Sequence, residues 1–100
     1  MKIIAITACP TGIAHTYMAA EQLERVGQQL GHTVKVETQG AMGIENRLTE
    51  ADVAGADALI LATDVAIEGR ERFAGLTKVV EVPVQLAIRH PADVFAQLGA

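Results

Sequence analysis

The sequence predicts an α/β fold: a three-layer α/β/α sandwich around a four-stranded parallel sheet in the flavodoxin-like order 2-1-3-4. Two observations lead to this prediction. First, the apolar runs within Lys2–Ala8 and Asp57–Thr63 are typical of strands buried on both faces of a parallel sheet. Second, strand-like and helix-like segments alternate with short connections, an order that gives right-handed crossovers and helices on both faces. With 100 residues, the chain is expected to form one domain over residues 1–100.

The first half of the chain contains an expected helix and a second expected strand. A helix is predicted from about Thr16 to Leu30, because its apolar residues recur on one helical stripe. Gly31 then follows as its left-handed C-terminal cap. The alternating residues Thr33–Thr38 predict a strand, placed at the sheet edge by its polar face. The glycine-punctuated stretch Gln39–Gly43 is expected to be a loop.

Local signals also divide the second half of the chain. The expected elements are a short helix from Thr49 to Gly55, a strand over Asp57–Thr63, a short helix over Arg70–Phe73, a strand over Thr77–Val82 and a C-terminal helix after Pro83. Thr49 and Asp52 resemble a capping box at the start of the first of these helices. Pro91 disfavours helical geometry at His90, so the last helix should be interrupted there.

Composition excludes several classes of function. Eight basic and twelve acidic residues give a net charge of −4, which argues against binding to a nucleic-acid backbone. A single cysteine excludes an internal disulfide and a four-cysteine zinc site. No apolar run approaches the roughly 20 residues that span a bilayer, and the apolar start is too short for a signal peptide. We therefore expect a cytosolic protein without nucleic-acid partner, membrane insertion, metal or cofactor.

The loop after the first strand is the expected site of chemistry. It contains Cys9, Pro10, Thr11, Gly12, Ile13, Ala14, His15 and Thr16. In parallel sheets, ligands bind beyond the carboxyl ends of the strands. Backbone N–H groups from Thr11 onward, together with the positive end of the helix dipole, are expected to cradle an anion. The same field should lower the pKa of Cys9, and the combination predicts a phosphocysteine site.

Three alternatives remain open at this stage. A lone cysteine often packs as a small hydrophobic residue. Cysteine phosphatases of this architecture use Cys-x5-Arg-Ser/Thr, and here His15 stands at the arginine position and Thr16 follows it. Without the arginine fork, hydrolysis should be slow, which favours a phosphoryl carrier over a low-molecular-weight cysteine phosphatase. A non-catalytic anion- or flavin-binding module is the third alternative.

Several segments resemble one known family. Residues Cys9–Glu21 and Val36–Gly40, with Glu45–Leu48 and Arg72–Gly75, are similar to the IIB domains of the fructose family of the bacterial phosphoenolpyruvate-dependent sugar phosphotransferase system. The resemblance implies that Cys9 accepts a phosphoryl group from a phosphohistidine of a IIA partner. The group would then pass to fructose or a fructose-like sugar on the membrane-embedded IIC partner. The implied protein is a component of a protein-phosphohistidine–sugar phosphotransferase, cytoplasmic and held at the inner membrane through IIC.

Residues at the rim of this loop are weaker candidates. The possible rim residues are Tyr17, Gln39, Gly40 and Asp64. Asp64 would be the general acid in a phosphatase, but a solvated loop aspartate is the commoner case and the favoured interpretation. One hypothesis is that His15 orders the loop or contacts the phosphate without accepting it, and the equally weighted alternative is a helix N-terminal residue that faces solvent.

The remaining polar and apolar residues near the loop have simpler expected roles. Glu45, Arg47 and the arginines of Arg70–Arg72 are expected to be solvated loop charges. The apolar residues of the loop, together with Tyr17, are expected to form a patch where partners dock transiently.

Overall fold

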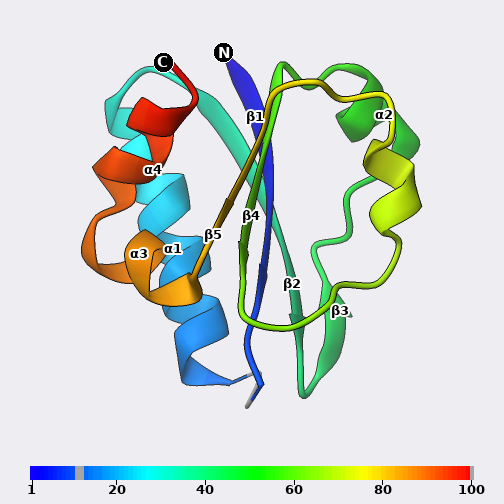
Figure 1. Ribbon diagram of the computed structural model, residues 1–100, viewed down its shortest axis with the longest axis vertical. Coiled ribbons are helices and arrows are strands. Elements are labelled where there is room, and N and C mark those ends of the chain that lie inside the picture. Colours follow the sequence, from blue (N-terminus) through cyan, green and yellow to red (C-terminus); the bar gives the residue numbers. More distant parts are fainter. Residues whose placement is uncertain (11–12, 100) are drawn as a thin grey trace.

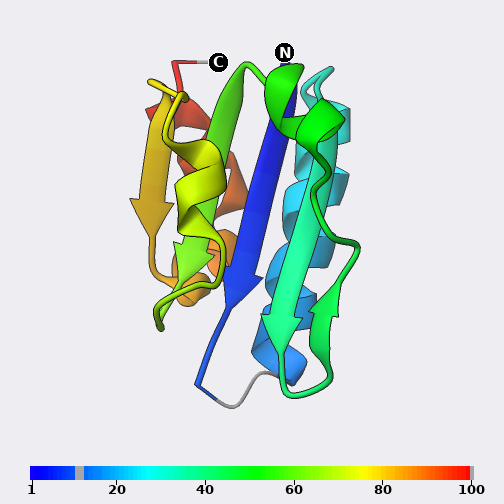
Figure 2. The same cartoon turned by 90° about the vertical axis from the view of Figure 1, so that its right-hand side faces the viewer.

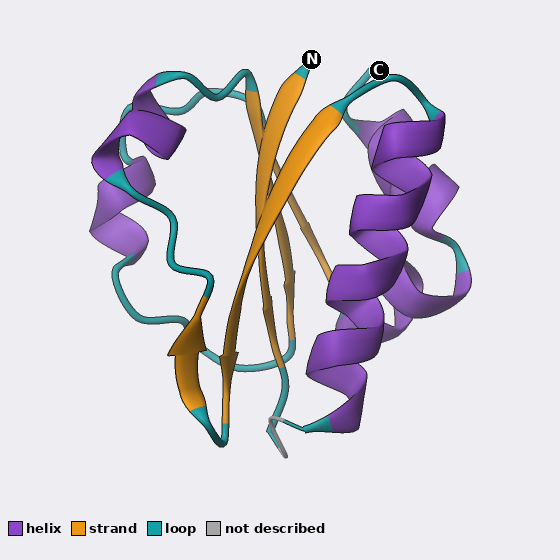
Figure 3. Cartoon of the chain, turned by 180° about the vertical axis from the view of Figure 1, so that it is seen from behind, coloured by secondary structure: helices purple, strands orange, loops and turns teal. Residues whose placement is uncertain are grey.

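The computed structural model describes residues 1–10 and 13–99, which form a central sheet between two layers of helices (Figure 1). The elements are β1 (Lys2–Ala8), α1 (Ala14–Gln29), β2 (Thr33–Gly40), β3 (Gly43–Glu45), α2 (Glu50–Ala54), β4 (Ala58–Thr63), the 3₁₀ helix η1 (Arg70–Phe73), β5 (Val79–Val82), α3 (Val84–Arg89) and α4 (Pro91–Gln97). Helices α1, α3 and α4 cover one face of the sheet, whereas α2 and η1 lie over the other (Figure 3). The predicted three-layer α/β/α architecture is confirmed.

The sheet has one more strand than predicted. Within the described residues it contains five strands in the order β3-β2-β1-β4-β5. The four parallel strands have the predicted order, but β3 pairs antiparallel with β2 through a tight hairpin. In this hairpin Gly40 pairs with Gly43, whose φ of 90° favours glycine. The predicted sheet therefore lacks one strand, the predicted loop over residues 39–43 is limited to the turn at Ala41 and Met42, and β2 is not an edge strand.

Alternate residues of the central strands supply two apolar cores. Ile3 and Ala5 of β1 point toward α1, whereas Ile4 and Ile6 point toward the layer of α2 and η1; all four are fully buried. Burial on both faces is what the continuous apolar run of this strand predicts. The sheet is consequently held from both sides.

Helix α1 packs against β2 at Gly27. A Cβ added to Gly27 would lie 2.3 Å from Val34 Cγ2, so only glycine permits this approach. The helix begins at Ala14, two residues before its predicted start. At its end Gly31, with φ of 85°, forms the predicted left-handed cap, and the His32 N–H donates to the Gly27 carbonyl at 2.9 Å.

Three other local predictions can be compared with the structure. The capping box of α2 is confirmed: the Asp52 N–H donates to Thr49 Oγ1 at 3.1 Å, and the Thr49 N–H donates to Asp52 Oδ2 at 2.8 Å. The break before Pro91 is confirmed, because α3 ends at Arg89 and α4 starts at Pro91. The last strand is shorter than predicted and begins at Val79.

Candidate functional site

The parallel register brings the expected site residues to one edge of the sheet. Ala8, the last residue of β1, pairs with Gln39 of β2 and with Thr63 of β4. The Asp64 N–H also donates to the Ala8 carbonyl at 3.0 Å. Cys9 therefore follows β1 at the carboxyl edge, where the start of α1 and the β2–β3 hairpin also lie (Figure 2).

The sulfur of Cys9 lies beneath the first turn of α1. Cys9 is 6% exposed and belongs to the apolar core on the α1 side of the sheet. Its Sγ is 3.0 Å from Oγ1 of Thr16, the third residue of α1, which is fully buried. The structure thus brings together two of the predicted loop residues, one at each end of the loop.

The start of α1 provides a positive field beside this sulfur. The Tyr17 N–H donates to the Ile13 carbonyl at 3.4 Å, which closes the first helical turn. The amides of a helix's first turn have no intrahelical acceptor, and the helix dipole places positive charge there. The first turn carries no acidic residue that would offset that field. This end of α1 can stabilise an anion.

The predicted loop is only partly described. Thr11 and Gly12 lie outside the described residues, so their expected part in an anion cradle stays a prediction. The exposed residues of its described part are Pro10, Ile13, Ala14 and His15.

Tyr17 connects the start of α1 to the added hairpin. Its hydroxyl donates a hydrogen bond to the Glu45 carboxylate of β3. This bond, which favours the protonated phenol, raises the pKa of Tyr17. Glu45 is exposed, as expected for a loop charge, but its contact holds the hairpin against α1. The hairpin turn carries Met42, whose side chain is 78% exposed.

Asp64 and Gln39 reach the same edge but make structural contacts. The Asp64 carboxylate accepts the Val84 N–H at 3.1 Å and so ties the end of β4 to the start of α3. The Gln39 side chain pairs with the backbone of Glu68: its Nε2 donates to the carbonyl at 3.0 Å, and its Oε1 accepts the N–H at 2.8 Å. Gly40 is the hairpin residue of β2. These contacts fix the segment after β4 next to β2.

A buried ion pair supports this edge from the face of α2 and η1. Glu37 is 0% exposed, and its two carboxylate oxygens accept Arg72 Nη1 at 2.9 Å and Nη2 at 3.0 Å. Gln39 Nε2 also donates to Glu37, at 2.8 Å. Burial raises the pKa of Glu37, but these hydrogen bonds lower it more, and the net pKa lies below its ordinary value. The expectation that Arg72 is a solvated loop charge was wrong.

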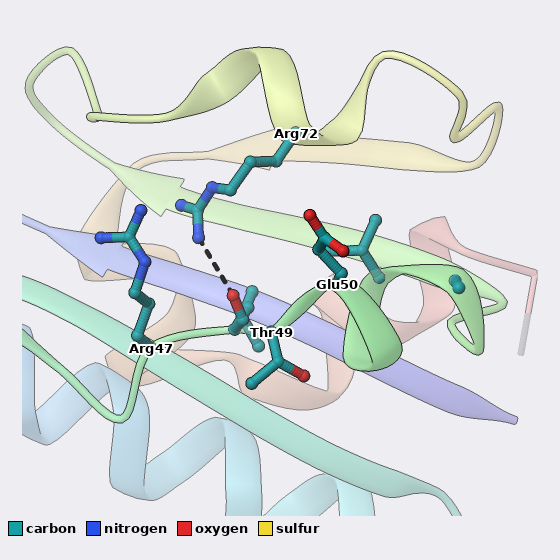
Figure 4. A pocket seen from close by; sticks show the side chains of 7 residues that line it. Arg47, Thr49, Glu50 and Arg72 are labelled. Carbon is teal, nitrogen blue, oxygen red and sulfur yellow. Dashed lines mark hydrogen bonds between the residues drawn. The ribbon is translucent and has the colours of Figure 1, made fainter.

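A cavity of about 750 Å³ lies between α2 and η1, in the layer that does not cover Cys9. It is lined by Arg47, Leu48, Thr49, Glu50, Val53, Ala54 and Arg72. Figure 4 shows both guanidinium groups at one end of the cavity and Glu50 near the other. The Arg72 guanidinium already donates hydrogen bonds to the Glu37 carboxylate and, from Nη1 at 3.3 Å, to the Leu48 carbonyl.

The described residues contain neither a cluster of metal ligands nor a helix that could span a membrane. Over residues 1–10 and 13–99, His, Cys, Asp and Glu side chains form no group of three or more that could hold a metal ion. None of the helices in that part of the chain combines the length and apolar character needed to cross a membrane.

Comparison with known proteins identifies the family. The family profile described as "PTS system, Lactose/Cellobiose specific IIB subunit" matches residues 4–97. The chain belongs to the IIB family of the sugar phosphotransferase system. A similar relative is the PTS system fructose-like EIIB component 2 of Escherichia coli K12, 52% identical over 99 residues, which cover 99% of this chain and 92% of that protein.

Two further comparisons extend this result. The fructose-like PTS system EIIBC component of Escherichia coli K12 is 51% identical over 100 residues, covering 98% of this chain. The chain spans only 20% of that relative's length. The crystal structure of a domain of the fructose-specific IIABC component of Borrelia burgdorferi is 42% identical, with a TM-score of 0.91, and covers 99% of this chain and 94% of that one. The α/β architecture of this chain is therefore that of a IIB domain.

Proposed function

We propose that this chain is a phosphoryl carrier that receives its phosphoryl group on Cys9. The observation that carries the proposal is the position of the Cys9 sulfur, at the carboxyl end of β1 and 3.0 Å from the Thr16 hydroxyl in the first turn of α1. There the backbone amides of α1 can stabilise charge on both the thiolate and the phosphoryl oxygens. Membership in the IIB family supports this assignment.

Two transfers make up the proposed reaction. In the first, the Cys9 thiolate attacks phosphorus in line; an S–P bond forms, and the P–N bond of a phosphohistidine on the IIA partner breaks. In the second, a sugar hydroxyl attacks phosphorus and loses its proton; an O–P bond forms, and the thiolate leaves. Phosphoryl transfer asks the protein mainly for positioning and charge stabilisation, which a backbone cradle provides.

The loop residues have distinct proposed roles. The amides from Thr11 to Thr16 hold the phosphoryl oxygens, Gly12 permits the tight loop, and Pro10 stiffens it. His15, exposed beside the site, orders the loop or contacts the phosphate.

The partners and the sugar class follow the relatives. One relative is named as an EIIBC component, and one structural neighbour belongs to a IIABC component, so IIA and IIC modules are the proposed donor and acceptor partners. A relative named fructose-like supports fructose or a related sugar as the final acceptor. Residues 1–100 would then act as a single IIB domain in the cytoplasm, at the inner membrane through IIC.

Exposed apolar side chains at the start of α1 and on the β2–β3 hairpin are the proposed docking patch. Ile13 is 60% exposed and Tyr17 37% exposed at the start of α1. The hairpin that Tyr17 holds through Glu45 adds Met42 to the same edge of the sheet. Adding the IIA partner should shift the amide resonance of Ile13. No perturbation near Ile13 would contradict docking there.

Phosphorylation of two variants tests the proposed function. After incubation with the phosphorylated upstream proteins, His15→Ala should retain label, whereas Cys9→Ser should carry no phosphohistidine. Phosphohistidine in the serine variant would assign the group to His15 instead. Sustained turnover of a generic phosphate ester would favour the phosphatase alternative. Full activity of Cys9→Ser in a transport-coupled assay would favour a non-catalytic binding module.

A further inference from the structure

Two buried threonines, Thr7 and Thr16, connect the chain segment of Cys9 to the first turn of α1. Thr7 and Cys9 are two residues apart on one chain segment, and both contact the first turn of α1. Thr7 Oγ1 donates to the Thr16 carbonyl at 3.0 Å, and Thr16 Oγ1 is 3.0 Å from Cys9 Sγ. Both threonines are 0% exposed. Thr16 is therefore attached to the β1 segment at two points, its carbonyl and its hydroxyl.

Because Thr7 is buried, its hydroxyl needs a hydrogen-bond partner inside the protein. It lies in a strand whose other residues from Ile3 to Ala8 are apolar and buried, and a hydroxyl without a partner there would be costly. Its hydrogen bond goes to the first turn of α1, the turn whose Thr16 hydroxyl contacts the sulfur.

The direction of the second hydrogen bond follows from the charge on sulfur. A thiolate only accepts hydrogen bonds, so the Thr16 hydroxyl must donate whenever Cys9 is ionised. Hydrogen bonds to a charged group are stronger than neutral ones, and sulfur loses its full charge once the S–P bond has formed. The bond is consequently strongest when the thiolate is attacking or leaving.

We propose that Thr16 is a catalytic residue that stabilises the Cys9 thiolate, and that Thr7 is the positioning residue that holds the Thr16 hydroxyl on the sulfur. This proposal rests on the proposed function of Cys9 as the phosphoryl acceptor. Because stabilisation of a thiolate makes it a better leaving group but a weaker nucleophile, it should favour transfer to the sugar more than acceptance from the donor. The two half-reactions should respond differently to loss of the hydroxyl.

The pH dependence of Cys9 alkylation by iodoacetamide tests the proposal without any partner protein. Removing a hydrogen bond to a charged group, as in Thr16→Val, should move the midpoint of the rate upward by about one pH unit. Thr16→Ser, which keeps the hydroxyl, should stay near the wild-type midpoint. Thr7→Val should move it in the same direction by less. Thr33→Val, at the opposite end of the sheet, serves as the control and should leave the midpoint unchanged.

The roles of Thr16 and Thr7 and the proposed function of Cys9 can each fail separately. A Thr16→Val midpoint equal to that of wild type would overturn the role of Thr16, and a Thr7→Val midpoint equal to that of wild type would overturn the positioning role of Thr7. If Thr16→Val does not fold, the comparison of Thr16→Ala with Thr16→Ser replaces it. Single-turnover transfer adds a second readout: sugar phosphorylation by phosphorylated Thr16→Val should slow about tenfold or more, whereas loading from the donor slows less. If wild-type Cys9 is never phosphorylated while the alkylation midpoints still shift, the proposed function fails and the hydrogen bond stands.

Discussion

Removal of Arg72 should destabilise the fold far more than removal of any exposed arginine. Its guanidinium meets both oxygens of Glu37 at 2.9 and 3.0 Å, and Glu37 is fully buried. In Arg72→Ala the carboxylate would stay in the interior without its counter-ion. Breaking a buried ion pair in this way costs about 3–5 kcal/mol. A large share of the total stability of a 100-residue domain would be lost.

Urea denaturation at pH 7 measures this loss, and Arg70→Ala provides a matched control. Both arginines lie in η1, but the Arg70 side chain is 60% exposed and pairs with Glu81, which is 54% exposed. Exposed pairs of this kind contribute about 0–1 kcal/mol. Arg72→Ala should lower the free energy of unfolding by several times more than Arg70→Ala. Equal losses for the two variants would refute the argument that the burial of Glu37 sets the magnitude.

The pH dependence of the free energy of unfolding gives a second test of the Glu37–Arg72 ion pair. Because the folded-state pKa of Glu37 lies below its ordinary value, the stabilisation by its charged form is complete above that value and is lost as the pH falls through the folded-state pKa. Without Arg72, burial still raises the pKa of Glu37 and is opposed only by the hydrogen bonds from Gln39 and the Leu48 N–H, so the pKa should be higher than in wild type and the variant should lose less stability in acid. The stability gap between wild type and Arg72→Ala should therefore narrow below about pH 4. A gap that stays constant from pH 7 to pH 3 would contradict this account.

Two further predictions concern the packing of α1 and the capping of α2. Gly27→Ala should lower the free energy of unfolding in urea by about 1–3 kcal/mol, because the added Cβ would lie 2.3 Å from Val34 Cγ2. The control Gly75→Ala, which has open space at its Cβ, should change it by less than about 0.5 kcal/mol. Similar values for the two variants would contradict the close packing of α1 against β2. Hydrogen bonds from Lys35, at 2.6 Å, and from the N-cap lower the pKa of Asp52 to about 2, so its stabilising effect should be complete above about pH 4 and disappear as the pH falls toward 2. Asp52→Asn should accordingly be less stable than wild type at pH 7 and equally stable near pH 2, and a loss that persists at pH 2 would show that the charge is not its cause.

Local signals predicted much of the fold and the place of the site. The apolar run of β1 and the cap at Gly31 depend on residues that are neighbours in the sequence, and the structure confirms both. The position of Cys9 followed from a general property of parallel sheets, whose carboxyl ends meet at one edge. These features need no knowledge of distant contacts.

Features that depend on contacts between residues far apart in the sequence could not be predicted from local patterns. The three residues of β3 form a strand only because β2 pairs with them, and three residues carry no periodic pattern of their own. The alternating pattern of β2 made Glu37 look solvent-facing, but its partner Arg72 comes 35 residues later. Thr7 could not be distinguished from the apolar core of β1, because its contact with Thr16 appears only once α1 is placed over the strand.

The most direct test of the central claim is the site of phosphorylation itself. The intact protein is incubated with the phosphorylated upstream proteins of a sugar phosphotransferase system, and its peptides are mapped by mass spectrometry. We expect one added phosphoryl group, on the peptide that contains Cys9, and its loss when a IIC partner and its sugar are added. A phosphoryl group on His15, or none on the protein, would contradict the account.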